Sequence, residues 1–203
     1  MSRDRVVCYQ IVRYPWKVGV AQNLDRDPIL EAYHLWNENG WEDCAVGCTA
    51  VTSLMRVHQM MTKRADQILA PIDLTFARYE LLVRLYFSAG SLPLSQLGKQ
   101  LQIHQTSITS LVDRLEKQGL IKRTPHLTDR RSTIAQMTPA GRVLTGKAIN
   151  LLNSELFRDL GLTGREAHLL IGLLMKMRRS WNDLERPEGW ELFEVGLDSP
   201  LAD

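Results

Sequence analysis

The segment from residue 104 to residue 118 most strongly limits how this chain can fold. Its apolar residues recur at helical spacing and predict one inward-facing stripe. The opposite face carries short hydroxyl and amide side chains near its N-terminal end. Threonine and serine lower helix propensity, so a face selected only for helix stability would carry Glu, Lys and Ala instead. The pattern therefore indicates a helix whose outer face serves a contact. The stripe consists of Ile108, Leu111, Val112 and Leu115, and the polar face of Gln105, Thr106, Ser107, Thr109 and Ser110.

The segments around this helix predict a winged helix-turn-helix. Thr75 can cap a helix over 76–90 that is apolar nearly all round, and Pro93 opens a short helix with inward leucines. Gly119 ends the polar helix. Two short runs with strand character, 120–125 and 132–139, then form a hairpin through 126–131. The order of helix, short helix, polar helix, hairpin and helix is that of a winged-helix DNA reader.

Further helices are predicted on both sides of this module. Residues 29–37 can form a short helix, and 42–70 a long one that Pro71 stops. A helix runs from 140 to about 159. Thr163 and Glu166 form a capping box before a last helix that reaches Trp181. The fold class is therefore mainly α, with a small β-hairpin wing.

Charge is unevenly distributed along the chain, although the net charge is only +2. Residues 95–133 hold seven basic and three acidic side chains, or +4, whereas 182–203 hold one basic and seven acidic ones, or −6. A basic module in a near-neutral chain indicates a polyanionic partner. On charge alone, a solvated charged face is the favoured interpretation.

The polar helix and the hairpin together indicate double-stranded DNA as that partner. Short side chains at the start of the second helix can reach base edges in the major groove, and Ser95 and Lys99 of the first helix can contact phosphates. A basic hairpin tip, with Arg130 and Arg131, fits the narrow minor groove. Asp129 can pair with an arginine such as Arg114 and fix the angle of the wing. The alternative for the hairpin is a polar turn with incidental charges.

The segment LVDRLEKQGLIKRTPHLTDRRSTIAQMTPAG, residues 111–141, resembles the multiple-antibiotic-resistance regulator (MarR) family of winged-helix transcription factors. The resemblance extends over about residues 45–180. It implies a homodimer that reads a pseudo-palindromic operator, typically as a repressor. It also implies that a small aromatic, anionic or lipid-like effector, or cysteine oxidation, releases the dimer from DNA. By position it assigns Asp129 and Arg131 to the wing and Arg114 to its anchor. The N-terminal arm, the acidic tail and His104 at the helix start depart from the family pattern.

With this resemblance, the chain divides into five parts, with a helical dimerisation domain formed from both ends. They are an N-terminal arm with a short helix (1–41), a dimerisation and linker helix (42–72), the winged helix-turn-helix (73–139), C-terminal dimerisation helices (140–181) and an acidic tail (182–203).

The resemblance to the MarR family implies a ligand pocket between the dimer helices and the reading module, and we expect the sensing site there. Methionines adapt to varied apolar ligands, and a histidine or arginine can meet a carboxylate. The alternative is a packed methionine-rich core. Trp36 and Trp41 of the arm are weaker candidates to close the pocket. The candidate ligand residues are Met55, His58 and Gln59, with Met61 beside them, from the long helix, and Tyr79, Arg84 and Tyr86 from the central one.

Cys44 and Cys48 provide a redox alternative. On a helix their Cβ atoms stand about 5–6 Å apart, whereas a disulfide needs roughly 3.5–4.5 Å. We therefore expect two small buried side chains without a bridge. The five histidines show no metal-binding spacing, and no phosphate loop or nucleophile motif occurs, so we expect no metal, no cofactor and no enzyme activity.

The remaining features of the sequence indicate where the protein is located and which other function is possible. Three cysteines without framework spacing, no membrane-length apolar run and no leader-like N-terminus favour the cytoplasm. A helical protein-interaction module that does not bind DNA is the rival. It explains dimerisation but not the basic module, and its association would not weaken steeply with salt.

Overall fold

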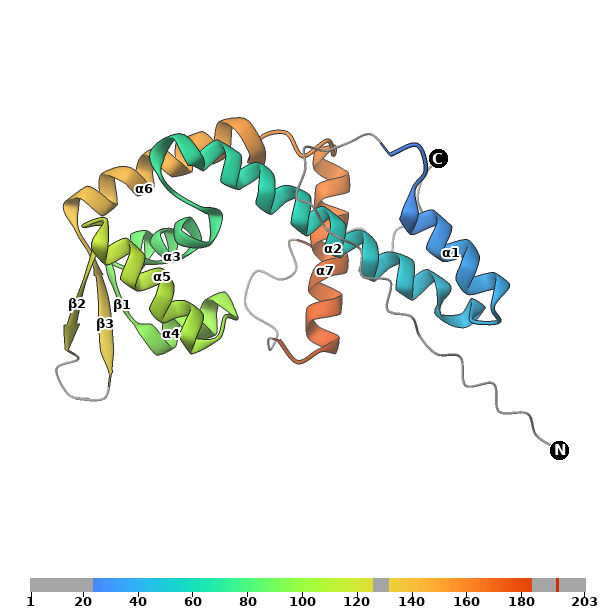
Figure 1. Cartoon of the computed structure of the whole chain (residues 1–203), viewed down its shortest axis with the longest axis horizontal. Helices are drawn as coiled ribbons and strands as arrows, with labels where there is room; N and C mark the ends of the chain where they lie inside the picture. Colours follow the sequence, from blue (N-terminus) through green and yellow to red (C-terminus); the bar gives the residue numbers. More distant parts are fainter. Residues whose placement is uncertain (1–23, 126–131, 184–192, 194–203) are drawn as a thin grey trace. The chain divides into compact units, whose positions relative to one another are not determined.

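The computed structural model describes residues 24–125, 132–183 and 193 (Figure 1). The side chain of Gln105 is outside this description. The chain divides into two compact units, residues 1–62 and 63–203, which are treated separately below. Within the described residues, none of the helices is long and apolar enough to cross a membrane.

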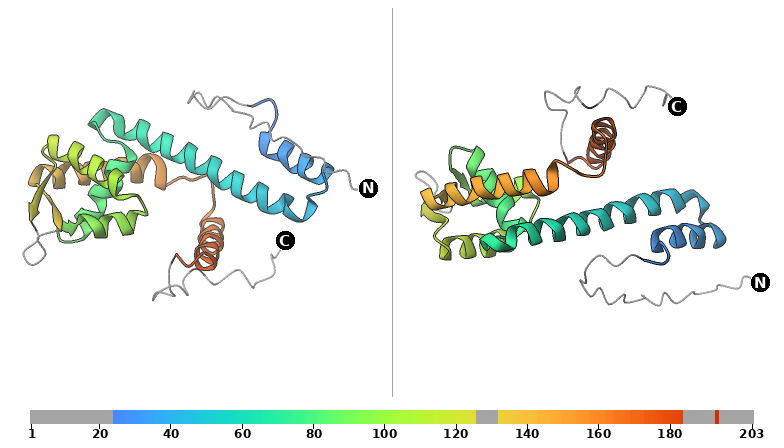
Figure 2. Two further views of the ribbon diagram at one scale, coloured as in Figure 1. Left: turned by 60° about the horizontal axis from the view of Figure 1, so that its bottom comes forward. Right: turned by 90° about the horizontal axis from the view of Figure 1, so that it is seen from above.

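The first unit contains helix α1 (Pro28–Glu38) and most of α2 (Glu42–Leu69). Asp27 caps α1 by accepting a hydrogen bond from the Ile29 N–H at 2.9 Å. The chain then reverses through Gly40, whose φ of +80° few other residues adopt. As a result α1 runs back along the start of α2 in both views of Figure 2. The rings of Trp36 and Trp41 meet edge to face across this turn.

The apolar face of α2 in this unit is not covered. Val51 and Met55, about one turn apart on one side of the helix, are 43 % and 58 % exposed, and Val46 and Met60 are exposed on the opposite side. Cys44 is exposed and Cys48 is half-buried, so the expectation of two buried cysteines is wrong for the single chain. Within this unit, no other element of the described residues covers Val51 and Met55.

The second unit is the winged helix with its flanking helices. The end of α2 leads into the short 3₁₀ turn η1, and a π-helical segment, η2, lies between the last two helices. After the end of α2, the elements of the second unit are η1 (Ala70–Ile72), α3 (Phe76–Phe87), β1 (Ser91–Pro93), α4 (Leu94–Leu101), α5 (Gln105–Lys117), β2 (Ile121–Pro125), β3 (Thr133–Met137), α6 (Pro139–Leu152), η2 (Asn153–Phe157) and α7 (Gly164–Ser180).

The wing is a three-stranded antiparallel sheet in the order β1-β3-β2. Ala135 of β3 lies between Leu92 of β1 and Arg123 of β2. The sequence predicted β2 and β3 but missed β1. This strand has three residues and includes Pro93, so it carries no pattern of its own and exists because β3 pairs with it.

The core of this unit lies between α3, α4, α5 and the sheet, with α6 packed on α3 (Figure 1). The inward stripe predicted for α5 is confirmed, since Ile108, Val112 and Leu115 are fully buried. Gly141 packs against the turn between α5 and β2, where an added Cβ would lie 2.1 Å from the carbonyl oxygen of Leu120. Only glycine allows this approach of α6 to the sheet.

The end of α6 differs from the prediction. The α-helical part stops at Leu152 and the chain continues as the π-helical η2, whereas the pattern predicted a helix to about residue 159. Leu156 of η2 is nonetheless buried. Apolar periodicity cannot distinguish an α-helix from a single wider turn with the same buried side.

Candidate nucleic-acid interface

The outer face of α5 is a surface of exposed hydroxyl groups. Thr106, Ser107, Thr109 and Ser110 are all exposed. The start of the helix is capped by an unusual residue: His104 Nδ1 accepts from the Thr106 N–H at 3.3 Å and lies 3.0 Å from the Thr106 hydroxyl. The imidazole of His104 therefore takes the capping place that Ser, Thr or Asp usually has.

Helix α4 and the turn after it hold α5 in place. Ser95 and Lys99 of α4 are exposed. Gln102 adopts a left-handed conformation with φ of +52° and reverses the chain between the two helices. Leu97 of α4 and Ile108 of α5 are buried in the shared core. The two helices thus form a helix-turn-helix whose polar residues remain on the outside.

Arg123 of β2 connects the wing to α5 and was missed in the sequence. Its guanidinium contacts the Asp113 carboxylate at 2.5 Å and the Glu116 carboxylate at 2.7 Å. Its own N–H donates to Glu116 at 2.9 Å, and Nη2 donates to the carbonyl of Thr109 at 3.3 Å. This arginine clamp fixes β2 against the recognition helix. The arginine four residues after Gly119 was the available signal.

The charges of Asp113 and Glu116 stabilise the charged form of Arg123 in the clamp. Burial lowers the pKa of Arg123, but the hydrogen bond and charge of Asp113, together with Glu116, outweigh burial and raise the pKa above its ordinary value. The arginine is therefore permanently charged. Both carboxylates of α5 are occupied by it, which lowers the negative charge that α5 presents to solvent.

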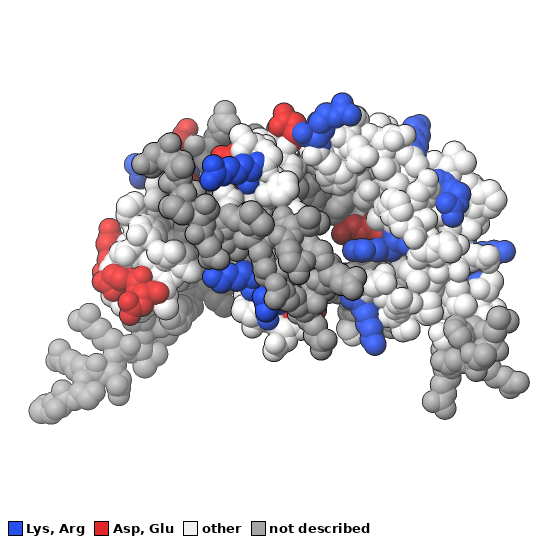
Figure 3. All heavy atoms as spheres, turned by 180° about the vertical axis from the view of Figure 1, so that it is seen from behind, with Lys and Arg blue, Asp and Glu red and all other residues white. Residues whose placement is uncertain are grey.

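The predicted wing residues Asp129, Arg130 and Arg131 lie outside the described residues. Arg114, their predicted anchor, is exposed on α5 and makes no ion pair with a described residue. Its pairing with Asp129 remains a prediction. On the face drawn in Figure 3, the part of this unit next to the wing carries separate basic side chains and few acidic ones.

The six ligand candidates fall in both units. Met55, His58 and Gln59 are exposed in the first. In the second, Tyr79 is buried in the core, where burial and then the charge of Glu80 raise its pKa, and its ring stacks on Phe76.

The other two candidates of the second unit lie nearer its surface. Arg84 is exposed. Tyr86 is half-buried under the guanidinium of Arg142, 5.0 Å from the ring centre.

The described part of the second unit has a half-open hollow of about 350 Å³ that includes none of these candidates. It lies between the end of α2, η1 and α6. Arg64 and Lys147 bring positive charge to it and Glu155 negative charge. Its apolar lining is Ile68, Pro71, Ile72 and Leu151, and Gln67 completes it. No group of three or more metal-binding side chains occurs among the described residues.

Comparison with known proteins agrees with this architecture. The MarR family model matches residues 74–133. The structure of a MarR family transcriptional regulator from Streptomyces coelicolor is 34 % identical and superposes with a TM-score of 0.63 over 69 % of this chain and 98 % of that one. The chain belongs to the MarR family.

Two further similarities lead to the same family. The multiple antibiotic resistance protein MarR of Escherichia coli is 28 % identical over 123 residues, which are 60 % of this chain and 85 % of that protein. A mutant of that protein in complex with operator DNA superposes with a TM-score of 0.60 at 25 % identity, covering 70 % of this chain and 97 % of that one. The match of the family model, 74–133, includes every residue predicted here to contact DNA.

Proposed function

We propose that this MarR family protein is a transcriptional regulator that binds a pseudo-palindromic operator in double-stranded DNA as a homodimer. The exposed hydroxyl face of α5 carries the proposal. It lies on the second helix of a helix-turn-helix, and its polar side chains are short enough to let the helix approach base edges. Lys99 and Ser95 of α4 would contact phosphates beside it.

The wing has a matching role in this proposal. Arg130 and Arg131 would enter the minor groove, where the potential is most negative, while Asp129 and Arg114 fix the loop. The arginine clamp supports this arrangement because it holds β2 at a defined angle to α5.

Two subunits would join through their helices. Apolar side chains remain exposed on α2 and on α7, including Met55, Leu173 and Trp181. Contiguous exposed apolar surface marks protein–protein contact in soluble proteins. A second copy of the chain would cover it and place two recognition helices on one face of the operator.

The dimer would most simply be a repressor, and an effector would release it from DNA. The candidates named from sequence remain proposals. The hollow beside η1 is a further candidate, because Lys147 borders an apolar lining and its charge suits an aromatic or lipid-like anion, while the other cation, Arg64, is ion-paired with Glu155. A redox alternative is favoured by the exposure of Cys44. Peroxide that releases the parent from DNA, but not the Cys44→Ser/Cys48→Ser variant, would support it.

The deciding experiment enriches binding sites from random-sequence DNA with the full chain and then titrates salt. We expect a two-fold-related site whose affinity falls steeply with salt, with a slope of about −0.9 for each phosphate contacted. Arg131→Ala should weaken operator binding by about tenfold, a typical effect of losing one groove contact. Its thermal midpoint and its state of association should match those of the parent.

Arg158→Ala, which removes an exposed arginine outside the winged helix, is the matched control for charge. Failure to enrich any sequence, or an unchanged Arg131→Ala affinity, contradicts the proposal. Salt-insensitive self-association without DNA binding would instead favour the helical interaction module.

A further inference from the structure

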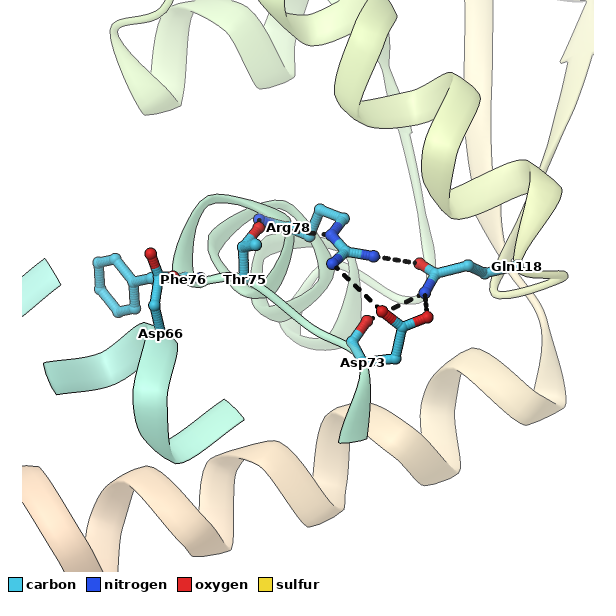
Figure 4. A network of polar contacts seen from close by, with 6 residues as sticks. All are labelled: Asp66, Asp73, Thr75, Phe76, Arg78 and Gln118. Atoms are coloured by element: carbon cyan, nitrogen blue, oxygen red, sulfur yellow. Dashed lines mark hydrogen bonds and ion pairs between the residues drawn. The ribbon is translucent and has the colours of Figure 1, made fainter. Parts of the chain in front are cut away.

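A polar cluster lies where the end of α2, the start of α3 and the end of α5 come together (Figure 4). Gln118, the C-cap residue of α5, reaches across to this corner. Its Nε2 donates to the backbone carbonyl of Asp73 at 3.0 Å and to the Asp73 carboxylate at 2.7 Å. Its Oε1 accepts from Arg78 Nη1 at 2.8 Å. Both ends of this amide are thus engaged.

Arg78 is the centre of the cluster. Only 12 % of its side chain is exposed. Its Nε donates to the Thr75 hydroxyl at 3.3 Å, and Nη2 lies 3.7 Å from the Asp73 carboxylate. The guanidinium is planar and its donors point in fixed directions, so an enclosed arginine with three different partners orients all of them. No buried side-chain polar atom of the described residues lacks a partner.

The cluster also includes α2. Asp66, one turn before the end of α2, accepts from the backbone N–H of Phe76 at 2.6 Å. This bond and the Thr75 cap both engage the first turn of α3. Asp73 itself has a left-handed φ of +53° and follows directly on η1. Hydrogen bonds therefore run from α2 to α3, and from α3 and η1 to α5, without passing through the wing.

We propose that Asp66, Asp73, Arg78 and Gln118 form a polar strut that sets the direction of α5 relative to the inner end of α2. Gln118 is a positioning residue for DNA reading, and the inference rests on the proposed function in that respect. In a homodimer joined by its helices, the strut determines how the two recognition helices are spaced and turned. A ligand or partner that moves η1 would then turn α5.

The effect of losing Gln118 follows from what else holds α5. Its buried stripe and the arginine clamp would keep it against the core and β2. Only the tie to η1 and α3 would be lost. The helix should therefore remain folded and attached to the wing while its direction relative to α2 becomes less defined.

Spin labels test this geometry without DNA. Gln67→Cys on α2 and Ser110→Cys on α5, both exposed positions, would carry labels in full-length protein with Cys8, Cys44 and Cys48 replaced by serine. Dilution with excess unlabelled chain isolates the distance within one subunit. We expect Gln118→Ala to broaden this distance distribution. Asn150→Ala, which removes an exposed amide from α6, should leave it unchanged.

Asp73 provides a conservative and a disruptive variant. Asp73→Asn keeps an oxygen acceptor for Gln118 and tolerates the left-handed backbone, so its distribution should remain narrow. Asp73→Ala should broaden it as Gln118→Ala does. A role only in stability would lower the thermal midpoint of these variants without changing the width. An unchanged width in both Gln118→Ala and Asp73→Ala would overturn the strut.

DNA binding tests the consequence for reading. One base pair inserted between the half-sites of the enriched operator turns them by about 35° relative to each other. The parent should discriminate strongly against the longer site. In Gln118→Ala the ratio of the two affinities should shrink by about tenfold, an ordinary size for coupling between two sites. An unchanged ratio contradicts the positioning role. If the parent protein enriches no DNA site, the proposed function is refuted. The spin-label distances then still test the strut by themselves.

Discussion

Half-buried polar side chains hold the described reading surface together, while its exposed residues make few contacts within the chain. Arg123 and Gln118 fix α5 from two sides, through Asp113 and Glu116 on one and through Asp73 and Arg78 on the other. The exposed threonines and serines of α5 are consequently presented on a helix that is held at its C-terminal half. Such support is what a binding surface on a short helix requires.

Replacing Arg123 by alanine removes three side-chain contacts, to Asp113, Glu116 and the Thr109 carbonyl, and leaves two carboxylates of α5 without their shared cation. We expect the free energy of unfolding to fall by about 1–2 kcal/mol, because hydrogen bonds to charged groups contribute at most a few kcal/mol and both acids are partly exposed. Denaturant titration measures the loss, and operator affinity should fall with it. Lys122→Ala, at an exposed neighbouring position of β2, is the control and should change stability little. Equal stability of the two variants would contradict the clamp.

The roles of single residues were only partly predictable. The burial of Ile108, Val112 and Leu115 followed from spacing, because a helix repeats every 3.6 residues whatever surrounds it. The partners of Arg123 did not. They depend on β2 running back past α5, which brings residues 7 and 10 positions apart into contact. Sequence reasoning assigned an anchoring role to Arg114 instead, and its proposed contact with Asp129 stays untested.

At the scale of elements, helix starts were better predicted than strand number or helix ends. Thr75 and Thr163 cap α3 and α7 as expected, because capping uses residues that are neighbours in sequence. Strand β1 and the π-helical η2 were not predicted. The first depends on pairing with β3 across the sheet, and the second is a wider turn that buries the same side as an α-helix would. Both are set by tertiary packing.

The capping box of α7 makes this helix sensitive to acid. The backbone N–H and then the hydroxyl of Thr163 donate to Glu166, at 2.7 and 2.8 Å, and lower the pKa of its carboxyl below the ordinary 4.5. Because the folded-state pKa is the lower one, this stabilisation is complete above the unfolded pKa and is lost as pH falls through the folded one. Amide exchange in the first turn of α7 should therefore quicken, relative to the intrinsic rate, below about pH 4.5.

Two variants separate the cap from other acid effects. Glu166→Gln should remove this pH dependence from the start of α7. Thr163→Ala should destabilise the helix at neutral pH by about 1 kcal/mol, the usual cost of losing an N-cap hydroxyl. Arg165→Gln, which changes an exposed charge in the same turn without touching the cap, should behave as the parent does. If Glu166→Gln keeps the acid response of the parent, another group is responsible.

At the scale of the molecule, the two units share one property: helices with apolar faces that nothing in the described chain covers. In the first unit the face belongs to α2, and in the second to α7, where Leu170, Ile171 and Leu173 are exposed and Gly172 is buried. Apolar residues at helical spacing can be recognised in the sequence of both helices, because amphipathic spacing is a local property. This spacing could not predict what covers the faces, since a partner leaves the same pattern in the sequence as a core does.

If a second copy covers the face of α7, a charge placed in it should separate the subunits. Leu173 is 51 % exposed in the single chain. Burying a leucine side chain contributes about 1.5–3 kcal/mol, so Leu173→Glu should weaken dimerisation by at least about tenfold. Sedimentation equilibrium over a range of concentrations measures the shift. Lys176→Glu, at an exposed position of the same helix, introduces the same carboxylate outside the apolar face and should leave the dimer intact.

Because operator binding through two half-sites depends on the pair of subunits, Leu173→Glu should also lose DNA affinity at low protein concentration and regain it as the concentration rises. A variant that remains dimeric while the parent does too would place the subunit contact on another face, with α2 as the next to test.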